Sequence, residues 1–253
     1  MQTQTKTYPD SPIKKIENKN PKWTIYFDED KHKFYKEDKK TRIQSVSAVP
    51  GIIDKSGAMM GWAVKCMGEY VIQNWDNYGV EELVVKAKRE YRNVSKEACD
   101  IGTEIHKWIE LYIAGKKPDI PNDEKISNGI MAFLQWEKKH KPEWILSEQI
   151  IYNKELDYAG ILDAVAIIDG KRYLIDFKSS KAIYPEMFIQ TAGYRLAYEE
   201  MTKAKIDACM IIRLGKEDGE FETAESKDME LEKELFIHAL NLGNKLKKYE
   251  KIC

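Results

Sequence analysis

Two runs of alternating apolar residues, 158–168 and 171–177, are separated only by Asp169-Gly170. An Asp-Gly pair between such runs predicts a β-hairpin with a two-residue turn, because a type I′ turn needs a positive φ at both central positions. In a two-residue loop Ile168 faces Lys171, which sets the register of the whole hairpin. Counting five residues back along one strand and five forward along the other then places Asp163 opposite Asp176.

This register brings two carboxylates together on an apolar surface. Side chains alternate between the faces of a strand, so Asp163 shares its face with Val165 and Ile167. Opposed residues have Cβ atoms ~4.5–5.5 Å apart, and like charges at that separation are destabilising. A divalent cation between the two carboxylates removes the conflict, and carboxylate oxygens suit Mg²⁺ or Mn²⁺.

Lys178 follows Asp176 by two residues and therefore projects from the same face of the strand. A metal lowers the pKa of a bound water and neutralises a phosphate, and a neighbouring ammonium can stabilise the charge that develops. The three residues together indicate hydrolysis of a phosphodiester. The alternative interpretation is a structural ion pair in which Lys178 neutralises one aspartate, and a loop one residue longer would change the register.

The rest of the chain divides into a helical first half and a β-rich second half, which predicts an α+β protein with a mixed central β-sheet flanked by helices and an N-terminal helical elaboration. We expect a flexible N-terminus over 1–20 and one domain over 21–253, with a hairpin and helical part (21–142) and a sheet part (143–253). A stripe of Trp62, Met67 and Tyr70 is expected in the core. The predicted strands or extended segments are 23–35 (a hairpin), 42–53, 143–152, 158–168, 171–177, 206–214 and 220–223, and the predicted helices are 58–75, 81–91, 95–114, 123–139, 185–201 and 228–251.

Composition excludes several classes of protein. With 43% hydrophobic residues and 41 Lys+Arg against 42 Asp+Glu, the chain is neither disordered nor uniformly basic, so a nucleic-acid site would be a local patch or assisted by metal. No apolar run approaches the ~20 residues of a membrane span, and the polar start lacks the apolar segment of a signal peptide. We therefore expect a cytoplasmic protein with no membrane partner. The four cysteines are widely spaced, which argues against a zinc or iron–sulfur site.

Four motifs in order resemble the RecB-like branch of the PD-(D/E)XK nuclease superfamily, which includes bacteriophage-type exonucleases. They are the pair Gly160-Ile161-Leu162-Asp163 and Asp176-Phe177-Lys178, the helical Gly102-Thr103-Glu104-Ile105-His106, the pair Gln190 and Tyr194 on the helix after the lysine strand, and 45–74, which is similar to the N-terminal region of phage members. The resemblance spans about 45–201. Leu162 stands where the name-giving motif has proline.

The resemblance implies an α/β/α restriction-endonuclease-like core and a metal site of Mg²⁺ or Mn²⁺. His106, Asp163 and Asp176 would hold the metal, with the Phe177 carbonyl as a further ligand. Lys178 would be the catalytic lysine, supported by Gln190 and Tyr194. The four-cysteine iron–sulfur cluster of some relatives, such as the CRISPR-adaptation nucleases, has no counterpart at these spacings, so no cluster is expected.

From the residues alone, these additional positions have a second interpretation. His106 lies on an apolar helical pattern and could be a core histidine, and Gln190 with Tyr194 could be one face of an amphipathic helix. Glu110, one turn after His106, could orient it or lie on a solvated face, and Glu148 is a candidate extra ligand.

Substrate contacts are expected from the basic run of Lys86, Lys88, Arg89 and Arg92, with Tyr91 among them. Lysine and arginine can contact phosphates, and an aromatic ring can stack on a base. If residues 58–114 pack over the sheet, this run would form one wall of a narrow channel above the metal. The alternative is a solvated helix face.

The expected function is a metal-dependent DNA exonuclease that acts on single strands or frayed ends in phage or bacterial recombination, replication or repair. It would work in the cytoplasm of the bacterial host, and a recombination or replication protein is a candidate partner. A structure-selective or flap endonuclease with the same site is the alternative within enzymes. A nuclease-like module that only binds DNA is the alternative outside them.

Overall fold

The computed structural model describes residues 4–6, 13–19, 22–250 and 252, and within them the protein is a mixed α and β structure around a ten-stranded mixed sheet. The strands are β1 (Gln4–Lys6), β2 (Ile13–Lys19), β3 (Lys22–Asp28), β4 (Lys33–Tyr35), β5 (Arg42–Ser45), β6 (Glu143–Asn153), β7 (Tyr158–Ile168), β8 (Lys171–Lys178), β9 (Ala208–Leu214) and β10 (Phe221–Glu225). The helices are α1 (Ser56–Asn74), α2 (Val80–Ala87), α3 (Glu90–Ile113), α4 (Glu124–His140), α5 (Pro185–Thr202) and α6 (Met229–Tyr249), with short 3₁₀ helices η1 (Val46–Ala48) and η2 (Pro50–Ile52).

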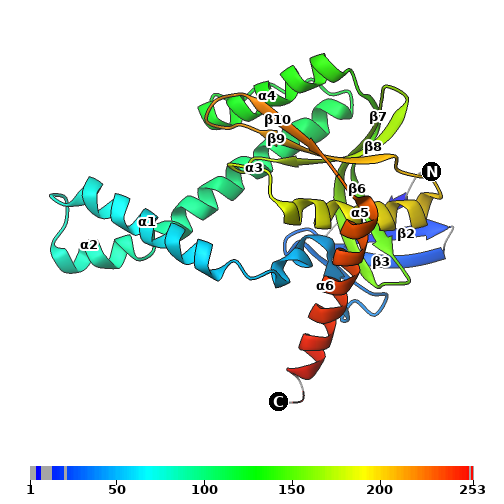
Figure 1. Ribbon diagram of the computed structural model, residues 1–253, viewed down its shortest axis with the longest axis horizontal. Helices are drawn as coiled ribbons and strands as arrows, with labels where there is room; N and C mark the ends of the chain where they lie inside the picture. The colour runs from blue at the N-terminus through cyan, green and yellow to red at the C-terminus, as the bar shows by residue number, and fades with distance from the viewer. Residues whose placement is uncertain (1–3, 7–12, 20–21, 251, 253) are drawn as a thin grey trace.

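The sheet runs in the order β1-β2-β3-β4-β5-β7-β8-β9-β10, and β6 pairs with β7. Two apolar cores lie against it. One joins α3 and α4 to the sheet around Phe133, Trp136 and Ile175, and the other joins α5 and α6 to it around Tyr158 and Phe236. Figure 1 shows α4 and α5 on either side of the central strands. Within the part of the chain that is described, no helix combines the length and apolarity needed to cross a bilayer.

The Asp169-Gly170 hairpin is confirmed. Both turn residues have positive φ, 50° at Asp169 and 76° at Gly170, as a type I′ turn requires. Ile168 pairs with Lys171, and the ladder continues without a shift to Ala164 opposite Ile175. The register that the turn predicts therefore holds along the paired part of the hairpin.

One edge of β7 is shared between two partners. β5 pairs in parallel with Tyr158 and Ala159 at the start of β7, and β8 pairs with it only from Ala164 onward. Residues 160–163 belong to neither ladder. The sheet therefore forks at Asp163, and the fork leaves an opening between the ends of β5 and β8.

Part of the N-terminal segment that the sequence predicts to be flexible is folded. Ile13–Lys19 forms β2, pairs with β3 along its whole length and buries Ile16. Gln4–Lys6 adds a further edge strand, β1. The consecutive Lys14 and Lys15 interrupt the apolar alternation, so the local pattern is too weak to indicate a strand. The rest of the 1–20 prediction lies outside the described residues.

Residues 42–53 are extended only as far as Ser45, where β5 ends. The chain then turns through η1 and η2, and Pro50 opens the second of them. Proline fits a first helical position because its φ is fixed and it needs no amide partner there. The prediction of one extended segment is therefore only partly correct.

Helices α1 and α2 form an arm that projects from the body of the molecule, and α3 runs from this arm to the sheet (Figure 1). Only Cys66 of α1 is buried. Trp62, Met67 and Tyr70 are half-exposed, so the predicted core stripe is wrong. The stripe has the spacing of an amphipathic helix, but the arm offers it a single neighbouring layer rather than a core.

Candidate functional site

Three carboxylates lie at the same level on three neighbouring strands. In the β6–β7 ladder the pairs Ser147–Ala164 and Gln149–Leu162 flank Glu148 and Asp163, which therefore face each other. Glu148 itself has a φ of 48°, a left-handed conformation that is uncommon for a non-glycine residue and is found at functional sites. On the other side of Asp163, the β7–β8 ladder stops one residue short of Asp176. Asp163 thus has a carboxylate on each side.

His106 on α3 completes the cluster. Its Nδ1 atom lies 3.7 Å from Asp163 Oδ2 and 4.0 Å from Glu148 Oε1. One potential ligand atom from each of these three residues lies within 4.8 Å of the others. Ile105 and Ile109 are buried and dock α3 on the sheet, which turns His106 toward the fork. A neutral imidazole beside two carboxylates is a suitable metal-binding group.

The main chain of β8 fixes the orientation of Asp163. The Phe177 N–H donates a hydrogen bond to Asp163 Oδ2 at 2.7 Å, and the Phe177 ring is anchored in the core below α3. The side chain of Asp163 is 12% exposed, so it reaches the opening while remaining held from behind. The expected ligand role of the Phe177 carbonyl stays a prediction.

Asp176 points toward Lys178 rather than into the histidine cluster. It is fully buried, and Lys178 Nζ lies 2.5 Å from its Oδ2. Neither oxygen of Asp176 has a hydrogen bond of normal geometry. Burial raises the pKa of Asp176 to about 6, because Lys178 offsets only part of the desolvation and Asp163 adds repulsion. A buried carboxylate with unused oxygen lone pairs fits a cation ligand, while the ion pair itself matches the alternative interpretation.

Lys178 keeps its proton in this setting. Burial alone would lower the pKa of its ammonium, but the carboxylates of Asp176 and Asp163 outweigh burial and raise it. The side chain is 22% exposed, so the ammonium is also accessible from the opening. It is therefore a permanent positive charge at the mouth of the site.

Gln190 and Tyr194 of α5 lie together beside the carboxylates. Gln190 Nε2 donates to the Tyr194 hydroxyl at 2.8 Å, and Tyr194 lines the same cleft as Asp163. Burial, followed by repulsion from Asp176 and Asp163, raises the pKa of Tyr194 well above its usual value. Because its oxygen already accepts from Gln190, the neutral hydroxyl is free to donate into the cleft.

Two glycines allow these elements to approach each other closely. A Cβ on Gly160 would lie 2.8 Å from Cε1 of Tyr194, and a Cβ on Gly102 would lie 2.9 Å from Oγ of Ser179. Each glycine is the first residue of one of the sequence motifs. Their lack of a side chain brings α5 against β7 and α3 against the end of β8.

Glu110 is exposed on α3 and lies close enough to Glu148 to repel its carboxylate. It lines the cleft, and no hydrogen bond joins it to His106 within the described residues. The pKa of Glu148 is raised to about 8, first by burial and then by repulsion from Asp163 and Glu110. The folded, metal-free protein therefore holds a proton on Glu148 at neutral pH.

This raised pKa predicts the pH dependence of stability. Between pH 4.5 and about 8 the folded state binds a proton on Glu148 that the unfolded chain has lost. The free energy of unfolding in EDTA should therefore decrease as the pH rises from 5 to 8. Denaturant titrations at several pH values would measure it. Glu148→Gln should flatten the slope and Glu143→Gln, on the same strand, should not; an equal slope in both variants would contradict the assignment.

The basic run lies away from the carboxylates. Lys86 is on α2, where it pairs with Glu82 at 3.1 Å and lies 3.8 Å from the centroid of the Tyr78 ring. Arg92 is in the first turn of α3, about 21 Å from His106 at 1.5 Å per residue. Lys88 and Arg89 lie between the two helices. These residues lie on the arm or at the start of α3, and none of them lines the cleft at the carboxylates, although their role in DNA binding stays a prediction.

The carboxylates open into a cleft of about 690 Å³. Its lining includes four polar residues that are not among the predicted site residues, namely Ser45, Ser47, Thr103 and Lys107. Thr103 precedes His106 by three residues and Lys107 follows Thr103 by four, so the period of α3 would have placed both on the cleft side of the helix. Ser45 and Ser47 reach the cleft only because β5 pairs with β7, which no local pattern indicates.

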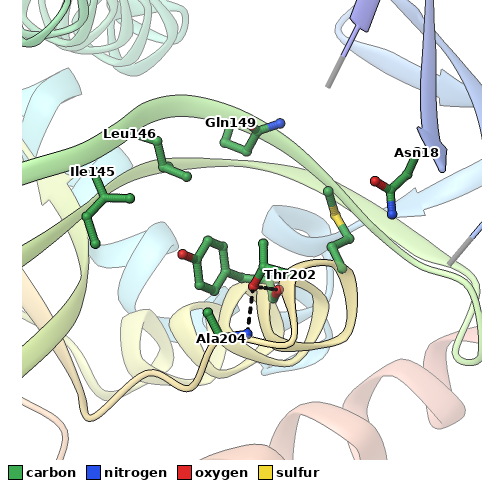
Figure 2. A pocket seen from close by; sticks show the side chains of 8 residues that line it. Asn18, Ile145, Leu146, Gln149, Thr202 and Ala204 are labelled. Carbon is green, nitrogen blue, oxygen red and sulfur yellow. Dashed lines mark hydrogen bonds between the residues drawn. The ribbon is translucent and has the colours of Figure 1, made fainter. Parts of the chain in front are cut away.

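A second hollow, of about 310 Å³, lies between β6 and the end of α5 (Figure 2). It is lined by neutral side chains, among them Leu146, Gln149 and Thr202. The Thr202 hydroxyl donates to the Tyr198 carbonyl and accepts from the Ala204 amide, so its hydrogen-bonding capacity is used within the helix end. The hollow shares no residue with the carboxylate cleft.

No protein-family model and no curated protein matches this chain. Inference about its function therefore depends on the chemistry of the site.

Proposed function

We propose that this protein is a metal-dependent deoxyribonuclease of the RecB-like PD-(D/E)XK type, with a restriction-endonuclease-like core. The observation that carries the proposal is the alignment of Glu148, Asp163 and Asp176 on three adjacent strands, with His106 and Lys178 at their mouth. Three carboxylates so close together on neighbouring strands repel one another, which destabilises the fold unless a cation or protons compensate their charge.

The donor set fits Mg²⁺ or Mn²⁺. His106, Glu148 and Asp163 converge, and the buried oxygens of Asp176 without hydrogen bonds could join them. When bound, the metal supplies a water of lowered pKa and neutralises charge on the phosphate. Carboxylate oxygens suit Mg²⁺, and the imidazole also suits Mn²⁺.

The residues of the chain supply the remaining functions. The Lys178 ammonium, kept protonated by its two aspartates, would donate to a phosphate oxygen and stabilise the negative charge that develops there. The Tyr194 hydroxyl would donate to the same group or to the nucleophile. The Phe177 N–H would keep Asp163 in place while the substrate binds. These are positioned charges and dipoles, which account for most of the catalysis of such displacements.

We further propose that cleavage begins at free DNA ends, as in an exonuclease of recombination, replication or repair. The carboxylate cleft has the volume of a pocket for a compact ligand, so one flexible strand fits it better than a duplex. A strand with an end can enter without being bent.

The test uses one circular single-stranded DNA, closed or linearised, incubated with the protein in Mn²⁺ or in EDTA. The linear form should be degraded in Mn²⁺, the closed circle should resist, and neither should change in EDTA. Rapid cutting of the closed circle would replace the exonuclease with the endonuclease alternative. No cleavage of any form in Mg²⁺ or Mn²⁺ would refute the nuclease proposal and favour a DNA-binding module.

A further inference from the structure

A groove of about 640 Å³, distinct from the hollow between β6 and α5, adjoins the carboxylate cleft. The two share Cys99, Gly102, His106 and Lys178, so the groove opens directly beside the proposed metal site. Its lining comes from the first turns of α1, from α3, from the start of α4, from the end of β8 with the segment after it, and from the turn between β9 and β10. These five segments are separate in the sequence.

The groove is rich in ammonium groups. Lys181 follows β8, Lys216 lies in the β9–β10 turn, and Lys125 is at the start of α4. Lys125 pairs with Glu97 at 2.7 Å. Within the described part of the chain, the ammonium groups of Lys181 and Lys216 have no ion-pair partner, so they are available to a bound anion.

The groove also has an apolar side. Met59 and Trp62 of α1 and Val94 of α3 line it, and Trp62 contacts Tyr91 edge-on with the ring centroids 6.3 Å apart. A half-exposed indole and two unpaired ammonium groups that line one groove are the combination that binds single-stranded nucleic acid, with bases stacked on the ring and phosphates held by the lysines. A ligand with only phosphates would not need the apolar wall.

We propose that this groove binds an unpaired DNA strand next to the phosphate that is cleaved, with a base stacked on Trp62 and phosphates held by Lys181 and Lys216. The inference rests on the proposed function for the nature of its ligand. It assigns strand binding to residues outside the basic run of the arm, and it explains why the first turns of α1 lie beside the catalytic end of β8.

The first test measures binding of a fluorescent oligothymidylate of about 12 nucleotides, within the ~4–16 nucleotides that single-strand sites cover, in EDTA so that it is not cleaved. Trp62→Ala should weaken binding about 5- to 150-fold, the value of one base–aromatic stack. Trp62→Phe should restore most of the affinity. Trp75→Ala, at the exposed far end of the same helix, is the matched control and should bind as the wild type does.

The second test uses the salt dependence of the same binding. The slope of log K against log salt is negative. The double variant with Lys181→Gln and Lys216→Gln should make it shallower by about 1.4, because each single-strand phosphate contact contributes about 0.7. Lys171→Gln, at the opposite end of β8 from Lys178, is the matched control and should leave the slope unchanged. Circular dichroism of each variant checks that the arm remains folded.

These outcomes separate the two proposals. If the wild type cleaves DNA in Mn²⁺ but the Trp62→Ala and double lysine variants both bind the strand as well as the wild type does, the groove proposal is overturned and the nuclease proposal stands. Weakened binding in these variants with no cleavage by the wild type would support the groove and refute the nuclease. No measurable binding of the oligothymidylate by the wild type would overturn the groove as well.

Discussion

Replacing Asp163 with alanine should reduce DNA cleavage at saturating Mn²⁺ by at least about a thousandfold. Asp163 is the central carboxylate of the three, it lies beside His106, and it is held by the Phe177 amide, so its loss would remove a proposed metal ligand and a fixed charge together. Asp169→Asn is the matched control in the same hairpin, because asparagine also tolerates the positive φ of this turn. The rate of release of an end label measures both.

Lys178 should be equally necessary, but its replacement needs a second variant. Lys178→Ala leaves Asp176 buried without its partner, which destabilises the fold. Combining Asp176→Asn with Lys178→Met removes both charges at similar volume and should give a folded, inactive protein. Near-wild-type cleavage by a folded form of this double variant, or by Asp163→Ala, would show that the assigned residues are not the catalytic site.

Metal binding should stabilise the wild-type protein strongly. A metal that binds only the folded state stabilises it by about 2.7 kcal/mol at 100 times its dissociation constant. For a chain of this length this corresponds to an increase in melting temperature of about 5–10 °C. Melting curves in EDTA and in Mn²⁺ measure the difference.

Asp163→Asn should raise the stability of the protein in EDTA and remove most of the stabilisation by Mn²⁺. In EDTA it should be more stable than the wild type by up to about 1 kcal/mol, because asparagine can still accept from the Phe177 amide while the repulsion with Asp176 is relieved. In Mn²⁺ it should show little or no stabilisation. A full metal-induced shift in this variant would exclude Asp163 as a ligand.

The hairpin of the site could be predicted because all of its signals are local. Asp169-Gly170 defines the turn, the alternation of β7 and β8 defines the faces, and a turn of fixed length defines the register. The close approach of Asp163 to β8 follows from these alone. His106 required a further step, the packing of α3 on the sheet, which only the resemblance provided.

The position of Glu148 could not be derived in the same way. β6 and β7 are joined by the longer connection 154–157, which carries no two-residue turn signal, so the sequence does not define the pair from which the register would be counted. The different orientation of Asp176 has a related cause. A register places backbones opposite each other, but the choice between His106 and Lys178 is made by side-chain rotamers and burial.

The arm and the groove depend on long-range packing. A basic run next to a helical pattern indicates a charged surface but does not indicate which part of the fold it faces, and here it lies on the projecting arm. Lys181 and Lys216 stand alone in the sequence, and only the pairing of β8 with β9 brings their segments together. No local pattern could have grouped them with Trp62.

The central claim is that the carboxylates of Glu148, Asp163 and Asp176 form one metal site. Its most direct test is a calorimetric titration of Mn²⁺ into the wild-type protein, Asp163→Asn and Asp169→Asn. The account predicts saturable binding by the wild type and by Asp169→Asn, release of protons near pH 7 because Glu148 must lose its proton to become a ligand, and loss of binding in Asp163→Asn. The absence of binding by the wild type, or unchanged binding by Asp163→Asn, would contradict it.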